Sequence, residues 1–491
     1  MASSADFLGR DTTEAPKDVA LPCAPGELPQ IYLHPTPAAK NEIDLPMSTA
    51  SARSLAAMKP ISTTPLLTSV VASILLGGCS KESVPAVATP ASKPTPPPVV
   101  QDPINLFTQR EEPSTAPRSG LPTIPFKDFS EGLPTSGTWR GYPLLQDFTG
   151  DGRADLIAAN REEDGYSAWE SPTSGPWQLR NDGLSRDMGY GPARAADVDF
   201  DGDIDLLVSA HTDAIRVFLN DGRMKWTRSE LPIDNTVLLL DIAVGKINDD
   251  LFPDIFGVGH FKGGLSVLTG DGRGGFQRRL EEKSLMNLTV MGRCVELADL
   301  DGDGKDDLFA GTNEGAKAFL SRGNGTLRWE DISTGLPVPS IGNTVYGVAV
   351  ERFTGAPQPQ LAVAIVADPG HALGKRNSIG VYEWKATDGT WVQIDRGLNR
   401  DDSYHDLKAA DFNVDGKMDL ITWSTESGVC VYLGDGEGGF RLQGCLPQRG
   451  RIALGDINAD GLVDIAIAWS ANKEFPTGGG VAAYLNQAEI W

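Results

Sequence analysis

The sequence predicts an all-β fold of seven similar units, each made of four short strands. Three observations lead to this prediction. A loop rich in Asp, Asn and Gly recurs about every fifty residues, an aromatic residue opens a short strand in each interval, and the 491 residues include 55 glycines, which favours turns over helices. Seven four-stranded units are typical of a seven-bladed β-propeller, a closed ring that leaves only short sheet edges.

The beginning of the chain has a different composition. Residues 1–57 have scattered prolines and no apolar periodicity. We expect either a disordered extension or sequence that precedes the true translation start at Met47 or Met58. Residues 80–125 are rich in Pro, Ser, Thr and Ala, so they cannot bury a core, and we expect a semi-extended tether with a glycosylated stalk as the alternative.

Residues 58–79 are expected to be a signal peptide. Lys59 supplies the positively charged n-region of the signal peptide. The apolar run 66–76 is too short for a permanent membrane span. Leu76-Gly-Gly-Cys79 resembles the bacterial lipobox, which implies cleavage before Cys79 and lipid attachment to its thiol. Ser80, in place of the aspartate associated with inner-membrane retention, indicates the outer membrane. The alternative is a buried helix that ends in Gly-Gly.

The recurrent loop is most complete at residues 299–308. Asp299, Asp301, Asp303 and Asp307 take positions 1, 3, 5 and 9, and Gly304 takes position 6. Two carboxylates 4 Å apart repel by about 4 kcal/mol at an effective dielectric of 20, so the turn needs a counter-ion. Clustered oxygen ligands in a pliant loop are what Ca²⁺ requires. The sequence therefore predicts a calcium site.

An EF-hand is the competing interpretation of this loop. It requires a bidentate Glu at position 12, where this chain has Ala310. The residues after Asp307 form an apolar run that is typical of a buried strand rather than a helix. The last expected ligand is therefore Asp307, at the beginning of a strand.

The loop recurs in phase along the rest of the chain. A slightly weakened copy has Thr149 at position 3. Two further slots have decayed: in one, Lys246 takes position 1 and Leu251 replaces the glycine, so calcium there is doubtful, and in the other, which begins at Arg352, no acid remains. Four or five calcium sites are expected. Besides the four acids of the loop at 299, the expected ligands are Asp147, Asp151, Asp155, Asp197, Asp199, Asp201, Asp205, Asp411, Asn413, Asp415, Asp419, Asp456, Asn458, Asp460 and Asp464.

The aromatic strand openings support the same count without using the acids. They are Phe126, Trp177, Trp226, Phe276, Trp329, Trp391 and Phe440, and several of these strands end in Gly-Leu-Pro. The first copy precedes the first acidic loop, and the chain ends at Trp491, where the last outer strand should begin. We therefore expect the segment at 126–134 to supply the outer strand of the last blade and close the ring.

These loops resemble those of the FG-GAP/VCBS-type repeat family, which includes the propeller of the integrin α head and many bacterial surface proteins. The resemblance covers residues 126–491. It implies Ca²⁺ bound by the side chains at positions 1, 3, 5 and 9 and by a main-chain carbonyl at position 7. We expect the ions to hold a turn in each blade rather than to catalyse a reaction.

Function is therefore expected on the face opposite the loops. Residues five or six positions before each loop lie about 17–20 Å away, at about 3.3 Å per residue. The resulting ligand face contains Tyr142, Arg293, Tyr346, Tyr404, His405 and Arg451 around the axis, with Asp241, Asp406, Trp139, Tyr190, His211, His260, Trp423 and Trp469 nearby. Aromatic rings and arginines suit sugars or acidic glycans, and ordinary loop packing is the alternative.

Catalysis is the second functional hypothesis. Tyr404, His405 and Arg451 could supply the base and the carboxylate-neutralising group of a polysaccharide lyase. The sequence shows no Ser-His-Asp elbow, P-loop or zinc signature. A net charge of −23 argues against nucleic acid as a partner.

The cysteines add one structural expectation. Cys430 and Cys445 flank a predicted hairpin, where they form either a disulfide or two buried thiols, and Cys294 has no evident partner. The sequence as a whole indicates a lipid-anchored, calcium-stabilised binding or scaffolding head on the bacterial outer membrane, facing the periplasm or the surface. Its ligand would be an unknown protein or glycan. The alternative is a carbohydrate-active enzyme.

Overall fold

The computed structural model describes residues 126–487 with short gaps. The gaps are residues 140, 162–164, 186–190, 211–212, 232, 234–238, 260–263, 280–284, 286–290, 324–326, 339–343, 367–377, 447 and 471–477. The expected N-terminal extension, the signal peptide with Cys79 and the tether lie outside the described residues and stay predictions.

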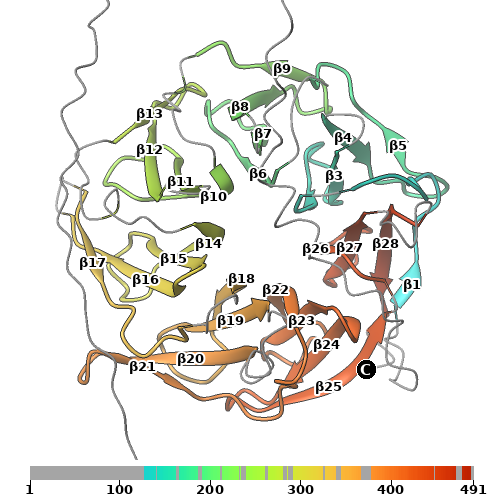
Figure 1. Ribbon diagram of the computed structural model, residues 1–491. Helices are drawn as coiled ribbons and strands as arrows, with labels where there is room; N and C mark the ends of the chain where they lie inside the picture. Colours follow the sequence, from blue (N-terminus) through green and yellow to red (C-terminus); the bar gives the residue numbers. More distant parts are fainter. Residues whose placement is uncertain are drawn as a thin grey trace, which may run out of the picture. The chain divides into compact units, whose positions relative to one another are not determined.

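The described strands form seven antiparallel sheets of four strands each, arranged in a ring (Figure 1). The predicted all-β, seven-bladed propeller is confirmed. We number the blades by the acidic loop that each contains, so blade 1 carries the loop at 147–155 and blade 7 carries the loop at 456–464. In the described part of the chain no helix is long and apolar enough to cross a membrane.

The strands of each blade follow in chain order from the axis outward. Blade 1 contains β2 (Leu144–Gln146), β3 (Asp155–Asn160), β4 (Gly165–Glu170) and β5 (Gln178–Leu179); blade 2 contains β6 (Ala193–Ala196), β7 (Asp205–Ala210), β8 (Asp213–Asn220) and β9 (Trp226–Arg228). Blade 3 contains β10 (Leu239–Gly245), β11 (Asp254–Gly259), β12 (Leu265–Gly270) and β13 (Phe276–Arg278); blade 4 contains β14 (Gly292–Ala298), β15 (Asp307–Thr312), β16 (Gly315–Ser321) and β17 (Trp329–Asp331).

The remaining blades have the same plan. Blade 5 contains β18 (Thr344–Glu351), β19 (Gln360–Val366), β20 (Ile379–Lys385) and β21 (Thr390–Gln393); blade 6 contains β22 (Tyr404–Ala410), β23 (Asp419–Ser424), β24 (Gly428–Gly434) and β25 (Phe440–Leu446). Blade 7 contains β26 (Arg451–Gly455), β27 (Asp464–Trp469), β28 (Gly480–Asn486) and, from the other end of the chain, β1 (Phe126–Asp128).

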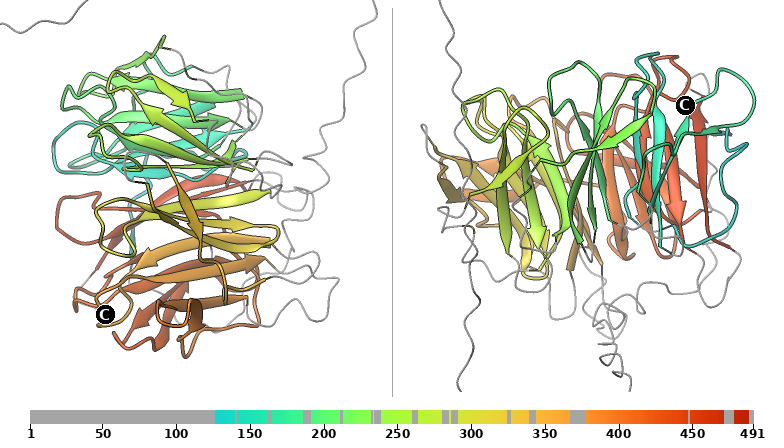
Figure 2. Two further views of the ribbon diagram at one scale, coloured as in Figure 1. Left: turned by 90° about the vertical axis from the view of Figure 1, so that its left-hand side faces the viewer. Right: turned by 90° about the horizontal axis from the view of Figure 1, so that it is seen from above.

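The first strands of the blades surround the axis, and the strands run between the two faces of the ring (Figure 2). Each acidic loop joins a first strand to a second strand. The loops therefore share one face, which we call the loop face. The first strands begin at the other side, which we call the opposite face.

The core lies between the blades. Seven clusters of buried side chains occupy the seven blade-to-blade interfaces. On β3, for example, Leu156 and Ala158 pack toward blade 7, whereas Ile157 and Ala159 pack toward blade 2. Alternate residues of a strand point to opposite faces, so a sheet between two neighbours needs apolar residues at every position. This is why the second strands appear as continuous apolar runs.

The recurrent aromatic residue and the Gly-Leu-Pro sequence connect neighbouring blades. The indole N–H of Trp177 donates to the carbonyl of Phe129 at 2.7 Å, and that of Trp391 donates to Ile332 at 2.8 Å. Gly132 has φ +92°, and a β-carbon there would meet the backbone of Trp177 at 2.8 Å. Glycine is required because the turn is left-handed and the next blade approaches it closely.

The ring is closed by the N-terminal strand, as expected. Phe126, Lys127 and Asp128 of β1 pair with Asn486, Leu485 and Tyr484 of β28. The Phe126 ring packs edge-on against Phe412 of blade 6 with ring centroids 6.3 Å apart. The pairing covers the free edge of β28, which would otherwise be open to another chain.

Cys430 and Cys445 form a disulfide between β24 and β25, where their positions are directly paired. Of the two arrangements considered for these cysteines, the structure has the disulfide. Cys294 is a buried free thiol on β14.

Removal of the closing strand tests its role. Deleting residues 126–130 exposes the edge of β28, so we expect a lower melting temperature and self-association at high concentration, measured by thermal unfolding and by light scattering. Deleting residues 121–125 instead serves as the length-matched control. An unchanged melting curve for the 126–130 deletion would contradict closure by this strand.

Candidate metal centres and the opposite face

A buried residue at loop position 9 opens the second strand of every blade. It is Gln360 in blade 5 and aspartate in the other six, and each is 0% exposed. The six aspartates are Asp155, Asp205, Asp254, Asp307, Asp419 and Asp464.

These carboxylates connect the two ends of the blade at the loop face. In blade 4, Asp307 Oδ2 accepts the N–H of Leu300 at loop position 2, at 2.8 Å, and Oδ1 accepts the N–H of Ser321 at the end of the third strand, at 2.7 Å. The other five aspartates accept the same pair of main-chain bonds, at 2.7–3.3 Å. Position 9 is therefore a structural anchor as well as a candidate ligand.

Burial changes the acidity of these groups. It raises the pKa of Asp205 and of Asp307 to about 7, although the main-chain N–H groups act in the opposite direction. The other acids of the same loops raise it further. A cation bound in the loop would favour the charged carboxylate.

The turn itself is left-handed at positions 4 and 6. Position 6 has φ between 81° and 96° at its five glycines, and blade 3 has the exposed Leu251 instead. Position 4 has φ near 60° even where it is Phe200, Val414 or Ala459. Such conformations cost a side-chain-bearing residue on the order of 1–3 kcal/mol. The loops keep a shape that brings their acids together in spite of this cost.

Two loops place three carboxylates within reach of one ion. Ligand atoms of Asp197, Asp199 and Asp205 in blade 2 lie within 4.8 Å of one another, and so do those of Asp299, Asp301 and Asp307 in blade 4. In blade 2, Oδ1 of Asp197 and Oδ1 of Asp199 are buried and have no hydrogen-bond donor. Buried anionic oxygens are costly without a partner, and the donor set fits a hard divalent cation.

In three loops a basic side chain of the protein pairs with one of the acids. Arg322 pairs with Asp301 at 2.5 Å in blade 4, and Lys417 pairs with Asp415 at 3.5 Å in blade 6. Arg153 pairs with Asp151 in blade 1. In these pairs the base contacts one carboxylate oxygen, and that oxygen is then shared with a cation of the protein. Among the described loops, blade 2 therefore has the acids best placed for an ion.

The two decayed loops keep their turns. In blade 3, Asp306 of the next loop accepts the main-chain N–H of Lys246 at 2.6 Å, and Lys305 pairs with Asp249 at 3.1 Å. In blade 5, Gln360 Oε1 accepts the N–H of Thr354 at 3.0 Å, in place of the aspartate. Neither loop brings three acids together among the described residues.

The opposite face is shaped by four β-bulges at one level of the ring. The first strands of blades 3 to 6 each contain one extra residue, namely Leu240, Arg293, Tyr346 and His405, between two paired residues. A bulge disturbs the alternation of side chains and redirects the extra residue. Three of the four bulged residues belong to the predicted ligand face.

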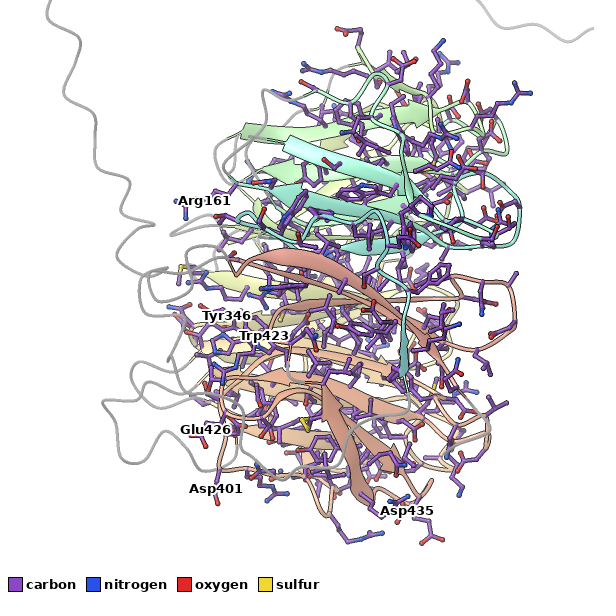
Figure 3. All side chains as sticks on the ribbon, turned by 90° about the vertical axis from the view of Figure 1, so that its right-hand side faces the viewer. Arg161, Tyr346, Asp401, Trp423, Glu426 and Asp435 are labelled. Atoms are coloured by element: carbon purple, nitrogen blue, oxygen red, sulfur yellow. A yellow bond between two sulfur atoms is a disulfide. The ribbon has the colours of Figure 1, made fainter. Side chains whose placement is uncertain are left out.

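The redirected residues meet at the axis. The Arg451 guanidinium lies 4.6 Å from the ring centroid of Tyr142, 5.4 Å from that of Trp423 and 5.7 Å from that of Tyr346. Arg293 lies 5.0 Å from the centroid of Tyr346. The His405 ring is 4.7 Å from the Trp423 ring. We call these six residues the axial cluster; Figure 3 shows Tyr346 and Trp423 close together on the opposite face.

Part of the axial cluster is fixed by hydrogen bonds. Tyr142 donates from its hydroxyl to the carbonyl of Tyr346 at 3.2 Å, and Arg451 donates to the Tyr142 hydroxyl at 3.1 Å and to the carbonyl of His405. By contrast, Nε of Arg293 and Nε1 of Trp423 are buried and have no hydrogen-bond partner. The cluster therefore contains two buried donors without an acceptor.

Tyr404 does not join the axial cluster. It precedes the bulge on β22 and is 1% exposed, in the core between blades 5 and 6. Its hydroxyl donates to the carbonyl of Asn399 at 2.6 Å and lies 3.4 Å from the hydroxyl of Tyr432. The structure thus keeps Tyr404, one of the two candidate lyase bases, away from Arg451. His405, the other candidate, lies in the axial cluster, where its carbonyl accepts from Arg451.

Other predicted residues have separate surroundings. Trp139 donates to the carbonyl of Ser136 and packs on Trp169 inside blade 1. Trp469 donates to the carbonyl of Gly478, and Asp406 accepts the N–H of Ile452 at 2.8 Å. Tyr190, His211, His260 and Trp491 lie outside the described residues.

A layer of paired charges beneath the axial cluster was missed in the sequence. Arg194 pairs with Asp241 at 2.8 Å, and Lys408 pairs with Glu296 at 3.3 Å across the axis. Arg194, Glu296 and Lys408 occupy the same register position on their first strands, two residues before the last of each strand. Charged residues at one level of otherwise apolar inner strands were the signal that could have revealed the layer.

A family model matches two segments of the propeller. A model of the FG-GAP-like repeat family matches residues 147–208 and 411–467. No curated protein is similar enough to the chain to count as a match.

Similar solved structures include BBS1N in complex with ARL6DN, with a TM-score of 0.49, 12% identity and coverage of 74% of this chain and 98% of that chain. An Agrocybe aegerita lectin, described for specific recognition of non-reducing terminal N-acetylglucosamine, has a TM-score of 0.45, 16% identity and coverage of 71% and 95%. The V. cholerae biofilm matrix protein Bap1 has a TM-score of 0.39, 13% identity and coverage of 74% and 91%. The protein is thus a seven-bladed β-propeller that carries FG-GAP-like repeats.

Proposed function

We propose that the acidic loops bind Ca²⁺ and that the bound ions stabilise the ring. The buried, donor-less oxygens of Asp197 and Asp199 carry this proposal, because a cation between them removes an otherwise uncompensated charge. The loops offer carboxylate and amide oxygens only, which suits a hard cation. Asp205 and Asp307 would act both as ligands and as anchors of their blades.

Calcium should therefore raise the melting temperature strongly. One site saturated at one hundred times its Kd adds about 2.7 kcal/mol to stability. We expect a higher melting temperature in CaCl₂ than in EGTA, measured by thermal unfolding. Asp199→Ser should lower stability in CaCl₂ but leave it equal or higher in EGTA, because it relieves repulsion in the metal-free loop.

Magnesium provides the control for non-specific ionic effects. The loop geometry is too flexible for the strict octahedron that Mg²⁺ requires, so MgCl₂ should shift the melting temperature much less. Identical curves in CaCl₂ and EGTA would overturn the proposal.

We also propose that the opposite face binds a ligand with acidic groups, such as an acidic glycan, so that the protein acts as a binding or scaffolding head. Arg293 supports this: its guanidinium stacks on Tyr346, and its Nε is buried without an acceptor. The indole N–H of Trp423 is a second buried donor at the same place. A carboxylate could accept from a guanidinium while a sugar ring stacks on an aromatic face.

An array of neutral, uronic and sulfated glycans tests this with a chain that begins at residue 80. We expect retention of acidic glycans, lost in Arg293→Gln and kept in the control Arg228→Gln, which alters an exposed arginine on the outer strand β9. Equal retention of acidic glycans by Arg293→Gln and by the unaltered chain, or no retention of acidic glycans at all, would count against this site. Unsaturated products from a bound uronate would instead indicate the lyase.

We further propose that the head is anchored to the outer membrane through a lipid on Cys79. The lipobox-like Leu76-Gly-Gly-Cys79 and the Pro-rich segment that follows support this, because such a segment can hold a folded head away from a membrane.

Fractionation of bacterial cells that express the full chain tests the anchor. We expect the protein in the outer-membrane fraction and Cys79→Ala in the soluble fraction, whereas Cys23→Ala should remain in the membrane. Membrane association of Cys79→Ala equal to that of the unaltered chain would rule out this anchor.

A further inference from the structure

Three blades carry a side chain that reaches from the end of the third strand to the acidic loop of the preceding blade. These residues are Ser171 after β4, Asn220 at the end of β8 and Asn486 at the end of β28. We call them clasp residues. Each occupies the position whose main-chain N–H binds the position-9 aspartate of its own blade.

The clasp bonds have the same geometry in all three cases. Asn486 Nδ2 donates to the carbonyl of Phe412 in blade 6, Ser171 Oγ to that of Ile457 in blade 7, and Asn220 Nδ2 to that of Phe148 in blade 1, each at 2.7 Å. All three acceptors are loop position 2, and these residues are at most 1% exposed. No water competes for bonds buried to this extent.

The bonds form a continuous path from loop to loop. The N–H at position 2 binds the aspartate of its own blade, whereas the carbonyl at position 2 binds the clasp residue of the next blade. For example, Asp419 accepts the N–H of Phe412, and Asn486 holds the Phe412 carbonyl and donates its own N–H to Asp464. The same two steps follow at the next blades. Asp464 accepts the N–H of Ile457, whose carbonyl accepts from Ser171, and Ser171 donates its own N–H to Asp155. Asp155 accepts the N–H of Phe148, whose carbonyl accepts from Asn220, and Asn220 donates its own N–H to Asp205.

The side-chain clasps link only four consecutive blades among the described residues. In blades 3 and 6 the equivalent residues are Gly270 and Gly434, which have no side chain, and in blade 4 the Ser321 side chain makes no described bond to blade 3. Elsewhere the links include main-chain bonds, from Gly274 of blade 3 to the Val198 carbonyl of blade 2 at 3.1 Å and from Asp306 of blade 4 to the Lys246 carbonyl of blade 3 at 2.9 Å. The loops that the clasps link are therefore those of blades 6, 7, 1 and 2, across the point where the ring closes. The two segments that match the FG-GAP-like repeat, 147–208 and 411–467, contain these same four loops.

We propose that the loops of blades 6, 7, 1 and 2 bind metal as one coupled unit, whereas the loop of blade 4 binds independently. This rests on the proposed binding of Ca²⁺. An ion held by the acids of one loop fixes its position-9 carboxylate, and the clasp bond transmits that restraint to the neighbouring loop. Order established in one loop therefore lowers the entropic cost of binding in the next. Asn220, Asn486 and Ser171 act as positioning residues.

The test breaks the loop of blade 7 and observes the loop of blade 6. Asp460→Ser removes an exposed acid at position 5 of the blade 7 loop. The readout is hydrogen exchange of peptides covering 411–419 and 299–307 in the full chain at increasing CaCl₂, which gives a calcium midpoint for each loop. The pair of blades 6 and 7 is preferred because blades 7 and 1 share a further main-chain bond, from Ala154 to Asp456 at 2.7 Å.

We expect Asp460→Ser to raise the calcium midpoint of the blade 6 loop by about fivefold or more, within the usual range of coupling. In an Asn486→Ala background the same change should shift that midpoint by less than about twofold. Ser321→Ala, which alters the equivalent residue of blade 4, should leave the fivefold effect in place. The midpoint of 299–307 should stay constant in every variant.

The outcomes separate this proposal from calcium binding itself. Calcium could protect peptide 411–419 from hydrogen exchange with the same midpoint in Asp460→Ser and in the unaltered chain. That result would overturn coupling and leave calcium binding in place. If calcium protects no loop in the unaltered chain, both are overturned. Should Asn486→Ala fail to fold, Asn220→Ala with Asp201→Ser applies the same test to the loops of blades 1 and 2.

Discussion

The loop end of six blades depends on one buried carboxylate that accepts two main-chain hydrogen bonds. Asp307 shows what the arrangement accomplishes: it joins the start of the acidic loop to the end of the third strand, at a fully buried site. A charge at such a site is costly unless it is hydrogen-bonded, and the two N–H groups meet that requirement. The same residue lies with the acids of its loop, so the anchor of the blade and a candidate metal ligand are a single side chain.

The two faces of the ring differ in chemistry because the first strands of the blades converge on the axis at one level. The loop face repeats a single chemistry blade by blade. On the opposite face, the bulges of blades 3 to 6 and the start of β26 bring different residues to one place. Arg293 and Trp423 retain buried donors there, whereas the paired charges of Arg194 with Asp241 and of Lys408 with Glu296 fill the axis beneath.

The repeats are not equivalent around the ring. Blades 6, 7, 1 and 2 keep most of the acids and the anchoring aspartate, and they include the closure through β1. Clasp residues of blades 7, 1 and 2 join their four loops. Blades 3 and 5 have lost acids but keep the turn through other bonds, such as those of Lys246 with Asp306 and Thr354 with Gln360. Joining the two ends of the chain at the ring closure costs conformational entropy. Metal ions bound in the neighbouring loops would stabilise the folded state and so offset this loss.

The sequence by itself determined the blade number, the loop positions and closure by the segment at Phe126. Each rests on a local pattern at fixed spacing, because strand alternation and turn chemistry act over a few residues. Only the tertiary structure decided which side chains meet. Tyr142 contacts Tyr346 although they are 204 positions apart, and one extra residue on β22 separates His405 from Tyr404. Such contacts depend on the closed ring and on bulges, and neither the residue spacing nor the strand period encodes them.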